Sequence, residues 1–489
     1  MDVKKQKRTE IRKELEKIID ELEQFPKAAK GLHEVEGHIF KRLLELGKML
    51  LCYYIFMVSE FVKLRGVPLD KEGKKMKNTG VRSRQYRSIF GLIEIKRPKY
   101  YSPTDKTHYV LDKELGLPDG RFSYILHDWL AYGAVDLDFD QSVNFLEKIL
   151  GQHLSGIQSS RVTYKCSAHV SDFYAVKDWG SVNDGTHLSV GFDGKGVPII
   201  RKETERSEES TSTRLGRGKK KGVKKEATVS VSSSFNPKQR TSADIINSLF
   251  RNSEQQQLNS APKEKHEWHK EKHIRAFLSD KVKAIEYGIE NVLKRDASGT
   301  KPIVVLIDGD RALRNAVEKV AVEKKIEHRI KTYVLDFIHV LEYVWKVANA
   351  YKGEKSKDRE SWVEQQAILL LDNRVEEVIE EWEKIASIKS YSTTQALNIK
   401  RGITYFKNHI EMMKYKTYLE EGFPITTGAV ESACGHFVKS RMERNAMHWG
   451  KEGAQKMLDI RAVKKNGDWE SFIHRFINQE QKKLYKKAA

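Results

Sequence analysis

The segment IVVLIDGDRAL, from Ile303 to Leu313, places two acids directly after an apolar run. The run is rich in β-branched residues, which predicts a buried strand that ends where Asp308 and Asp310 begin. In open α/β sheets this end of a strand is where ligands and metal ions bind, but an aspartate there also commonly caps the helix that follows. The strand pattern alone does not rank the two acids. The helical spacing of Leu313, Val317 and Val320 predicts that Asp310 is the N-cap of the next helix, whereas Asp308, at the strand terminus, is expected to be the ligand.

Two further acids occupy comparable positions in the sequence. Asp193 lies in HLSVGFDGKGVPII, which predicts a strand that ends at Asp193, a glycine turn and a second strand, and Glu431 is expected in the first turn of a long helix. Two carboxylates at adjacent strand ends and a third from a helix can hold two divalent ions, which stabilise the attacking and leaving oxygens of a phosphoryl transfer. Mg²⁺ prefers hard oxygen ligands. Asp193, Asp308 and Glu431 are therefore candidate catalytic residues and ligands for two Mg²⁺ ions, for which Mn²⁺ can substitute.

Composition and charge narrow the classes of protein. The 489 residues are 39% hydrophobic and 9% aromatic, which predicts a folded chain with several domains. A net charge of +20 favours a polyanionic partner such as DNA. The longest apolar run, residues 49–58, is too short to cross a bilayer, and the charged N-terminus has no leader pattern. We therefore expect a cytoplasmic, nucleoid-associated protein with no membrane partner. Three widely spaced cysteines support neither a disulfide framework nor a zinc site.

The order of periodic segments predicts the organisation of the chain. We expect an α/β catalytic core with an RNase H-like mixed sheet, a helical N-terminal region and a large all-α insertion, since the core reads strand, strand, strand, helix, strand, helix, strand. The helix between the third and fourth strands is expected over residues 275–296. The expected divisions are a helical N-terminal region (1–85), a hairpin plus helix-turn-helix DNA-binding domain (86–180), the first part of the core (181–340), the helical insertion (341–422), the last core helices (423–465) and a basic tail (466–489).

Several basic segments are candidates for DNA binding. A helix that ends at Leu150, a break at Gly151 and a helix over residues 157–174 fit a helix-turn-helix, although a plain helical pair fits the pattern equally well. Gln158 and Arg161 would then reach base edges. The block RLGRGKKKGVKK has no acid and is expected to be a mobile arm that binds phosphates. Its cations are Arg214, Arg217, Lys219, Lys220, Lys221, Lys224 and Lys225.

Two other groups have competing interpretations. Lys439, Arg441 and Arg444 follow Glu431 on the same expected helix, where they either contact DNA phosphates or form a solvated basic face. The histidines of HEWHKEKH, the last of them His273, share one face of an expected helix. Because lysines and glutamates separate them, a solvated charged face is the better interpretation than a metal site. Trp449 is expected to be a core aromatic rather than a stacking platform for a base.

Five segments together resemble a known family. GFDGKGVP, VVLIDGDRAL, YVLDFIHVLEYVW, TTGAVESACGHFVKSRMERNAMHW and EGAQKMLDIRAVKKNGDW follow one another in this order over roughly residues 85–480. They resemble the ISKra-type insertion-sequence transposases of bacteria, relatives of the Mutator-like DDE transposases. The resemblance implies an RNase H-like domain in which Asp193, Asp308 and Glu431 are the metal-binding acids. It also assigns a structural or supporting role to Asp336 and His339, in the D-x-x-H motif of these relatives.

The resemblance implies a two-step reaction on double-stranded DNA. Water first cuts at the ends of the element, and the freed 3′-OH then attacks target DNA without a covalent enzyme intermediate. Because two ends must be joined, a homodimer or a higher synaptic complex is expected. Two other functions keep the same fold: a domesticated DNA-binding protein without catalysis, and a cellular Mg²⁺-dependent nuclease. The presence of all three acids argues against the first, and a separate N-terminal DNA-reading region argues against the second.

Overall fold

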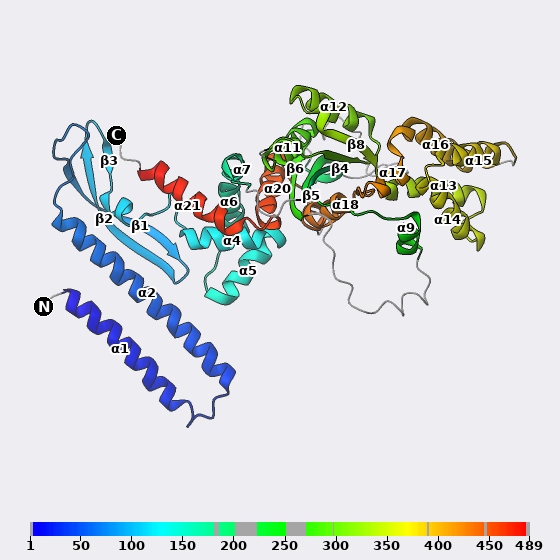
Figure 1. The fold of residues 1–489 in the computed structure, drawn as a ribbon. Helices are drawn as coiled ribbons and strands as arrows, with labels where there is room; N and C mark the ends of the chain where they lie inside the picture. The colour runs from blue at the N-terminus through cyan, green and yellow to red at the C-terminus, as the bar shows by residue number, and fades with distance from the viewer. Residues whose placement is uncertain are drawn as a thin grey trace, which may run out of the picture. The chain divides into compact units, whose positions relative to one another are not determined.

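The computed structural model describes residues 3–179, 185–200, 223–250, 270–296, 298–388, 391–444 and 447–485. The chain forms two compact units, residues 1–175 with 468–489, and residues 176–467. Each unit contains both helices and strands, and the first contains both ends of the chain (Figure 1).

The first unit begins with a helical hairpin. Helix α1 (Val3–Gln24) lies along α2 (Leu32–Leu64), and Arg42 of α2 pairs with Glu14 at 2.6 Å and Glu21 at 3.1 Å. Another face of α2 packs on a three-stranded antiparallel sheet whose buried side includes Ile93 and Ile95. The strands are β1 (Lys77–Ser88), β2 (Gly91–Ser102) and β3 (Lys106–His108).

The expected boundary of the helical N-terminal region, at residue 85, was wrong. The segment from Lys77 to Ser88 is a strand, paired with β2 from Ser88↔Gly91 to Lys77↔Tyr101. Its first seven residues are exposed, so they lack the apolar alternation that identifies a half-buried strand. The basic residues of β1 therefore resembled a linker in the sequence.

Five helices follow the sheet, and three of them share a small core. Helices α4, α5 and α6 surround Leu130, Val143, Leu146, Leu154 and Val162. Helix α5 ends at Gly151, whose φ of +63° favours glycine, and Ser155 caps α6. The single helix expected over residues 157–174 is divided near Ala168 into α6 and α7. The five helices are α3 (Val110–Glu114), α4 (Tyr124–Asp136), α5 (Phe139–Leu150), α6 (Gly156–Ser167) and α7 (Val170–Val176).

The expected basic C-terminal tail is instead the helix α21 (Trp469–Tyr485). Its apolar side buries Phe472 and Phe476 in the first unit, where Phe472 meets Phe173 edge to face. Glu480 is 3% exposed and pairs with Lys165 of α6 at 2.5 Å. The helical spacing of its aromatic residues therefore outweighs the charge of the last residues.

The second unit is built on a five-stranded mixed sheet in the order β6-β5-β4-β7-β8. The first three strands along the chain pair antiparallel, and β7 and β8 extend the sheet parallel to β4. The strands are β4 (His187–Ile199), β5 (Val223–Phe235), β6 (Lys270–Leu278), β7 (Ile303–Ile307) and β8 (Ile330–Leu335). All five residues of β7 are buried, as the apolar run predicted.

The strand that carries Asp193 differs from its prediction. Instead of ending at Asp193, β4 continues to Ile199, paired with β5 along its whole length. Gly194 and Gly196 form no turn, and the side chains of Glu226 and Lys224 lie against them from β5. The expected second strand is thus the second half of β4.

The helix expected over residues 275–296 is a strand followed by a helix. Strand β6 runs to Leu278, and α11 (Lys281–Lys294) begins after Ser279, whose φ is +57°, and the N-cap Asp280. His273 is therefore buried in a strand, where its Nε2 lies 2.7 Å from the Tyr287 hydroxyl, and the expectation of a solvated helical face was wrong. His266 and His269 lie outside the described residues.

Helices complete the second unit around the sheet and beyond it (Figure 1). Helix α12 (Arg311–Glu323) follows β7, and α13 (Phe337–Tyr351) follows β8. The expected all-helical segment comprises α14 (Asp358–Leu371), α15 (Val375–Ile388), α16 (Thr393–His409) and α17 (Tyr415–Glu420). The chain then returns over the sheet through α18 (Gly428–Ala433), a π-helical turn (Cys434–Lys439), α19 (Ser440–Met442) and α20 (Lys451–Lys465), while α9 (Ser242–Leu249) precedes β6.

Candidate active site

Strand register brings Asp193 and Asp308 together. The parallel pairing of β4 with β7 runs to Gly191↔Leu306, and each acid lies two residues beyond this pair. Since side chains two positions apart on a strand point to the same face, both carboxylates project from one face at neighbouring strand positions. Burial raises the pKa of the Asp308 carboxyl, and the nearby Asp193 raises it further.

The same face is covered by α18, which carries Glu431. An added Cβ on Gly191 would lie 2.5 Å from Val430 Cγ2, so the absence of a side chain at this position lets the helix approach β4 closely. Burial, Asp336 and Asp193 together raise the pKa of Glu431. The three acids singled out from the sequence therefore come to the same face of the sheet from β4, the end of β7 and α18, where Asp193 interacts electrostatically with each of the other two.

Asp336 follows β8 and is fully buried, but its oxygens are already engaged. Oδ1 accepts from the Ile338 amide at 2.7 Å as the N-cap of α13. Oδ2 accepts from the Thr427 amide at 3.0 Å and from the Thr427 hydroxyl. Because Thr427 directly precedes α18, Asp336 fixes the start of the helix that carries Glu431 to the end of β8.

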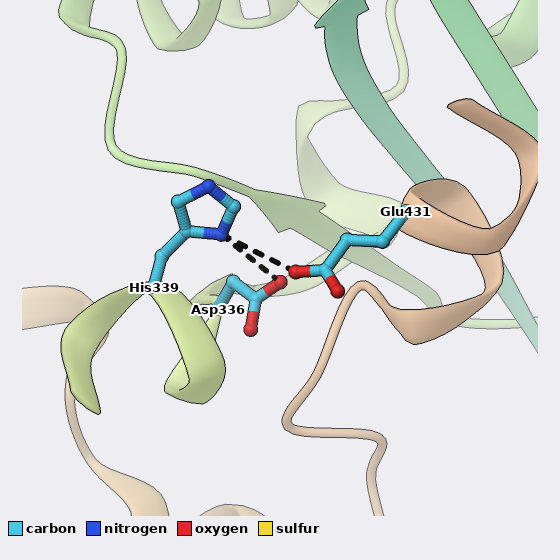
Figure 2. Close-up of side chains that lie close together, drawn as sticks. All are labelled: Asp336, His339 and Glu431. Carbon is cyan, nitrogen blue, oxygen red and sulfur yellow. Dashed lines mark ion pairs between the residues drawn. The ribbon is translucent and has the colours of Figure 1, made fainter. Parts of the chain in front are cut away.

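The His339 ring points toward the carboxylates of both Asp336 and Glu431 (Figure 2). Its Nδ1 is 3.6 Å from Asp336 Oδ2 and 3.4 Å from Glu431 Oε1. The adjacent Asp336 carboxylate raises the pKa of His339 to about 9, against the opposing effect of burial. At neutral pH this side chain is therefore a cation that offsets the surrounding negative charge.

One group of acidic and histidine side chains has the spacing of a possible metal site. Asp336, His339 and Glu431 offer ligand atoms within 4.8 Å of one another. A protonated imidazole cannot ligate a metal, however, and both oxygens of Asp336 are occupied by donors. Burial is the largest cause that raises the pKa values of Asp308 and Glu431, and the nearby Asp193 raises both further.

Asp310 has a different role from Asp308. Its Oδ1 accepts from the Ala312 amide at 2.9 Å, which confirms the expected N-cap of α12, and its Oδ2 lies 2.5 Å from Lys281 Nζ. Although burial acts in the opposite direction, Lys281 and the helix amides lower the pKa of Asp310. Its charge is thus used locally, while Asp308 accepts a single backbone bond, from the Asp310 amide at 3.0 Å.

Two side chains of the helical segment hold the turn after β7. The Tyr405 hydroxyl donates to the Asp308 carbonyl at 2.8 Å, and His409 Nε2 lies 2.8 Å from the Gly309 carbonyl. Tyr343 stacks on Tyr405 with ring centroids 4.0 Å apart. Gly309 has a φ of +88°, and the Tyr405 hydroxyl would lie 2.5 Å from an added Cβ. Sequence reasoning missed Tyr405 and His409, because a side chain that binds a distant backbone carbonyl leaves no local motif.

Cys434 and Arg461 complete the surroundings of Glu431. Burial and the neighbouring Asp193 raise the pKa of the Cys434 thiol, which can donate to that carboxylate. Arg461 donates to the carbonyls of Phe437 at 2.7 Å and His436 at 2.8 Å, in the π-helical turn. The buried Arg461 guanidinium thus satisfies carbonyl groups that the π-helical turn leaves without their usual helical donors.

The cations proposed to contact DNA beside the acids do not form one basic face. Arg441 is fully buried, with its guanidinium 4.9 Å from the Trp449 ring, so its assignment as a phosphate contact was wrong. Trp449 is itself a core residue, as expected. Lys439 is exposed, and Arg444 is half-buried. The amphipathic spacing that buries Arg441 was hidden by the π-helical turn, which changes the face that each residue presents.

The other candidate DNA-binding residues fall into three groups. Lys224 and Lys225 are exposed on β5 rather than on an arm, and Lys224 pairs with Glu443. Gln158 is used as a cap, since its Oε1 accepts from the Ser155 amide at 3.1 Å, whereas Arg161 is exposed on α6. The remaining residues of the arm, Arg214, Arg217, Lys219, Lys220 and Lys221, lie outside the described residues.

Comparison with known proteins adds no assignment. Within the parts of the chain that the structure describes, no helix has the length and apolar character needed to cross a membrane. No family model matches the sequence, and no curated protein matches it either.

Proposed function

We propose that the chain is a DNA transposase that cuts DNA at the ends of its element and transfers the freed strand to target DNA. The observation that carries the proposal is the convergence of Asp193, Asp308 and Glu431 on one face of the sheet. The strand order β6-β5-β4-β7-β8, with three antiparallel strands followed by two parallel ones, supports an RNase H-like core.

In this proposal the three carboxylates would hold two Mg²⁺ ions, which would supply charge stabilisation to the phosphoryl transfer. The chain contributes geometry. Asp336 and Thr427 fix the start of α18, and Tyr405 holds the carbonyl of Asp308. His339 is a cation that reduces the electrostatic repulsion between the Glu431 and Asp336 carboxylates before ions bind.

Double-stranded DNA is the proposed substrate, both at the element ends and at the target. The net charge of +20 supports electrostatic association with phosphates. The exposed Arg161 near the start of α6 makes that helix the candidate reader of base edges in the major groove. A homodimer or higher complex would join two ends of the element. We propose that the reaction takes place on the bacterial chromosome, in the cytoplasm.

The test uses a supercoiled plasmid that carries the DNA flanking the gene on both sides. The full chain should produce Mg²⁺- or Mn²⁺-dependent nicks at defined end sequences and joined strand-transfer products. Glu431→Gln should abolish nicking and strand transfer while retaining DNA binding. Glu443→Gln, at the end of α19, is the control and should retain nicking and strand transfer. Nicking without end specificity or joined products would instead support a cellular nuclease, and no metal-dependent cleavage would overturn the proposal.

A further inference from the structure

Helix α2 has three long faces, and two of them are covered within the first unit. One face meets the β-sheet through residues such as Ile55 and Val62. A second meets α1, where Arg42 and His38 pair with acids. The third face is apolar, and the first unit leaves it largely exposed.

The exposed face has a regular repeat. We define the α2 stripe by its seven apolar side chains, which recur at intervals of three and four residues: Phe40, Leu43, Leu50, Tyr54, Met57, Phe61 and Leu64. The one position of the repeat without a side chain is Gly47, where the Phe90 ring from the β1–β2 turn packs instead. This 3-4 spacing sustained over more than three heptads is the pattern with which helices pair along a seam.

The exposure of the α2 stripe is unusual for side chains of this size. Leu43 is 53% exposed, Tyr54 57% and Leu64 86%. Large apolar side chains of a helix that packs on two neighbours are usually buried. Six of the seven side chains are between 44% and 86% exposed. At about 150–250 Å² for a fully exposed large side chain, they present several hundred Å², the same order as the roughly 800 Å² that each partner contributes to a standard interface. A contiguous apolar patch of this extent marks an interaction surface.

We propose that the α2 stripe is the surface through which two copies of this chain associate. A second copy fits the repeat because its own stripe has the same spacing, so a two-fold axis brings equivalent knobs and holes together. None of the seven side chains is charged, so pairing the stripes desolvates no ionised side chain of either stripe. The two long helical hairpins then pack side by side, and the β-sheets lie on the outer faces of α2.

The test measures the mass of the full chain without DNA or metal ions. Light scattering after size exclusion, over the micromolar range, should give twice the 56.5 kDa of one chain. Leu43→Glu with Leu50→Glu should raise the dissociation constant by about a hundred-fold or more, because each carboxylate would be buried in the interface. Both positions are at least half exposed in the single chain, so the variant should keep the far-UV circular dichroism of the wild type.

A matched control places the same substitutions elsewhere in the first unit. Val81 and Leu92 are exposed apolar residues of the sheet, at 57% and 45%, and Val81→Glu with Leu92→Glu should leave the dimer intact. A wild-type chain that is monomeric throughout, or a stripe variant that dimerises as well as the control, would overturn the proposal. If the double glutamate variant unfolds, Leu43→Ala with Leu50→Ala must still weaken the dimer. Since no cleavage is measured, the result is independent of the proposed catalytic function.

Discussion

The ends of β7 and β8 have the same sequence pattern but use their acids differently. Each strand ends in buried apolar residues and is followed at once by an aspartate, and a helix begins within three residues of that aspartate. After β8, Asp336 caps α13 itself and also binds Thr427 through its second oxygen. After β7, Asp310 caps α12, and Asp308 accepts one amide bond from the residues that the structure describes.

This difference shows that the availability of a strand-end acid depends on which residue satisfies the helix N-terminus. The extra Gly-Asp after Asp308 moves the cap two residues along the chain, because Gly309 adopts a φ of +88°. Asp308 is thereby left half-buried beside Asp193, with a raised pKa. Asp336 must cap its helix itself, because no second acid follows it. Its carboxylate therefore binds backbone groups and positions the helix of Glu431.

The largest expected effect is that of Asp308→Asn. We expect metal-dependent cleavage to fall by about two orders of magnitude or more, because the amide keeps the shape but loses the charge that holds the ions. The melting temperature should stay unchanged or rise, since burial and Asp193 already disfavour the ionised form. Cleavage and thermal unfolding of the same preparation test both parts. An active Asp308→Asn would remove this acid from the site.

Asp336→Asn should reduce cleavage together with stability. The amide group would face the Thr427 amide and hydroxyl, so two donors to a buried carboxylate would lose their acceptor, at a cost of about 3 kcal/mol. Urea unfolding measures the loss, and cleavage at a temperature where the variant is folded measures the displacement of α18. Glu342→Gln, at an exposed position of α13, is the control. An inactive but fully stable Asp336→Asn would indicate that Asp336 is a metal ligand.

Tyr405→Phe tests whether the helical segment positions Asp308. Loss of the 2.8 Å bond to the Asp308 carbonyl should lower cleavage by about ten-fold and raise the Mg²⁺ concentration for half-maximal activity, because the turn can move. Tyr418→Phe is the matched control, since that hydroxyl donates to the Tyr333 carbonyl, within β8. Equal activity of both variants would leave the helical segment without a role in the site.

The parallel part of the sheet could be predicted from sequence because its signals are local. The apolar run of β7, the Asp310 cap and the spacing of Leu313, Val317 and Val320 in α12 all lie within one segment. Asp193, Asp308 and Glu431 were found by their positions at element ends and by resemblance. Asp193 lies at the strand position next to Asp308 although β4 does not end there, since the register depends on the position of the residue and not on the end of the strand.

The parts that sequence reasoning missed depend on tertiary contacts. Residues 275–278 of β6 lie shortly before α11, so they were interpreted as the start of one helix, whereas pairing with β5 makes them a strand. Arg441 was read as a solvated cation because the π-helical turn shifts the buried face by one residue. Tyr405 acts on a backbone carbonyl, which has no sequence identity of its own.

The pH dependence of stability distinguishes His339 from an ordinary histidine. Because Asp336 raises its pKa from 6.5 to about 9, His339 binds its proton more tightly in the folded state than in the unfolded chain. Its stabilising effect is complete below about pH 6.5 and is lost as the pH rises to about 9. In EDTA, the free energy of unfolding of the wild type should fall over this range relative to His339→Gln. His436→Gln, an exposed neighbour of α18, should behave as the wild type does.

The smallest expected effect on cleavage is at Asp310, and two substitutions separate its contacts. Asp310→Ala removes both the cap and the pair with Lys281, and should cost about 1 kcal/mol. Asp310→Asn keeps an oxygen that can accept from the Ala312 amide, so it should cost less, because the pair with Lys281 is partly exposed and weak. Both variants should still cut DNA at near the wild-type rate, since Asp308 keeps its carboxylate beside Asp193. Urea unfolding and plasmid cleavage measure the two effects. If Asp310→Asn is stable but inactive while Asp308→Asn still cuts, Asp310 is the ligand and Asp308 is not. The difference drawn between the ends of β7 and β8 would then be wrong.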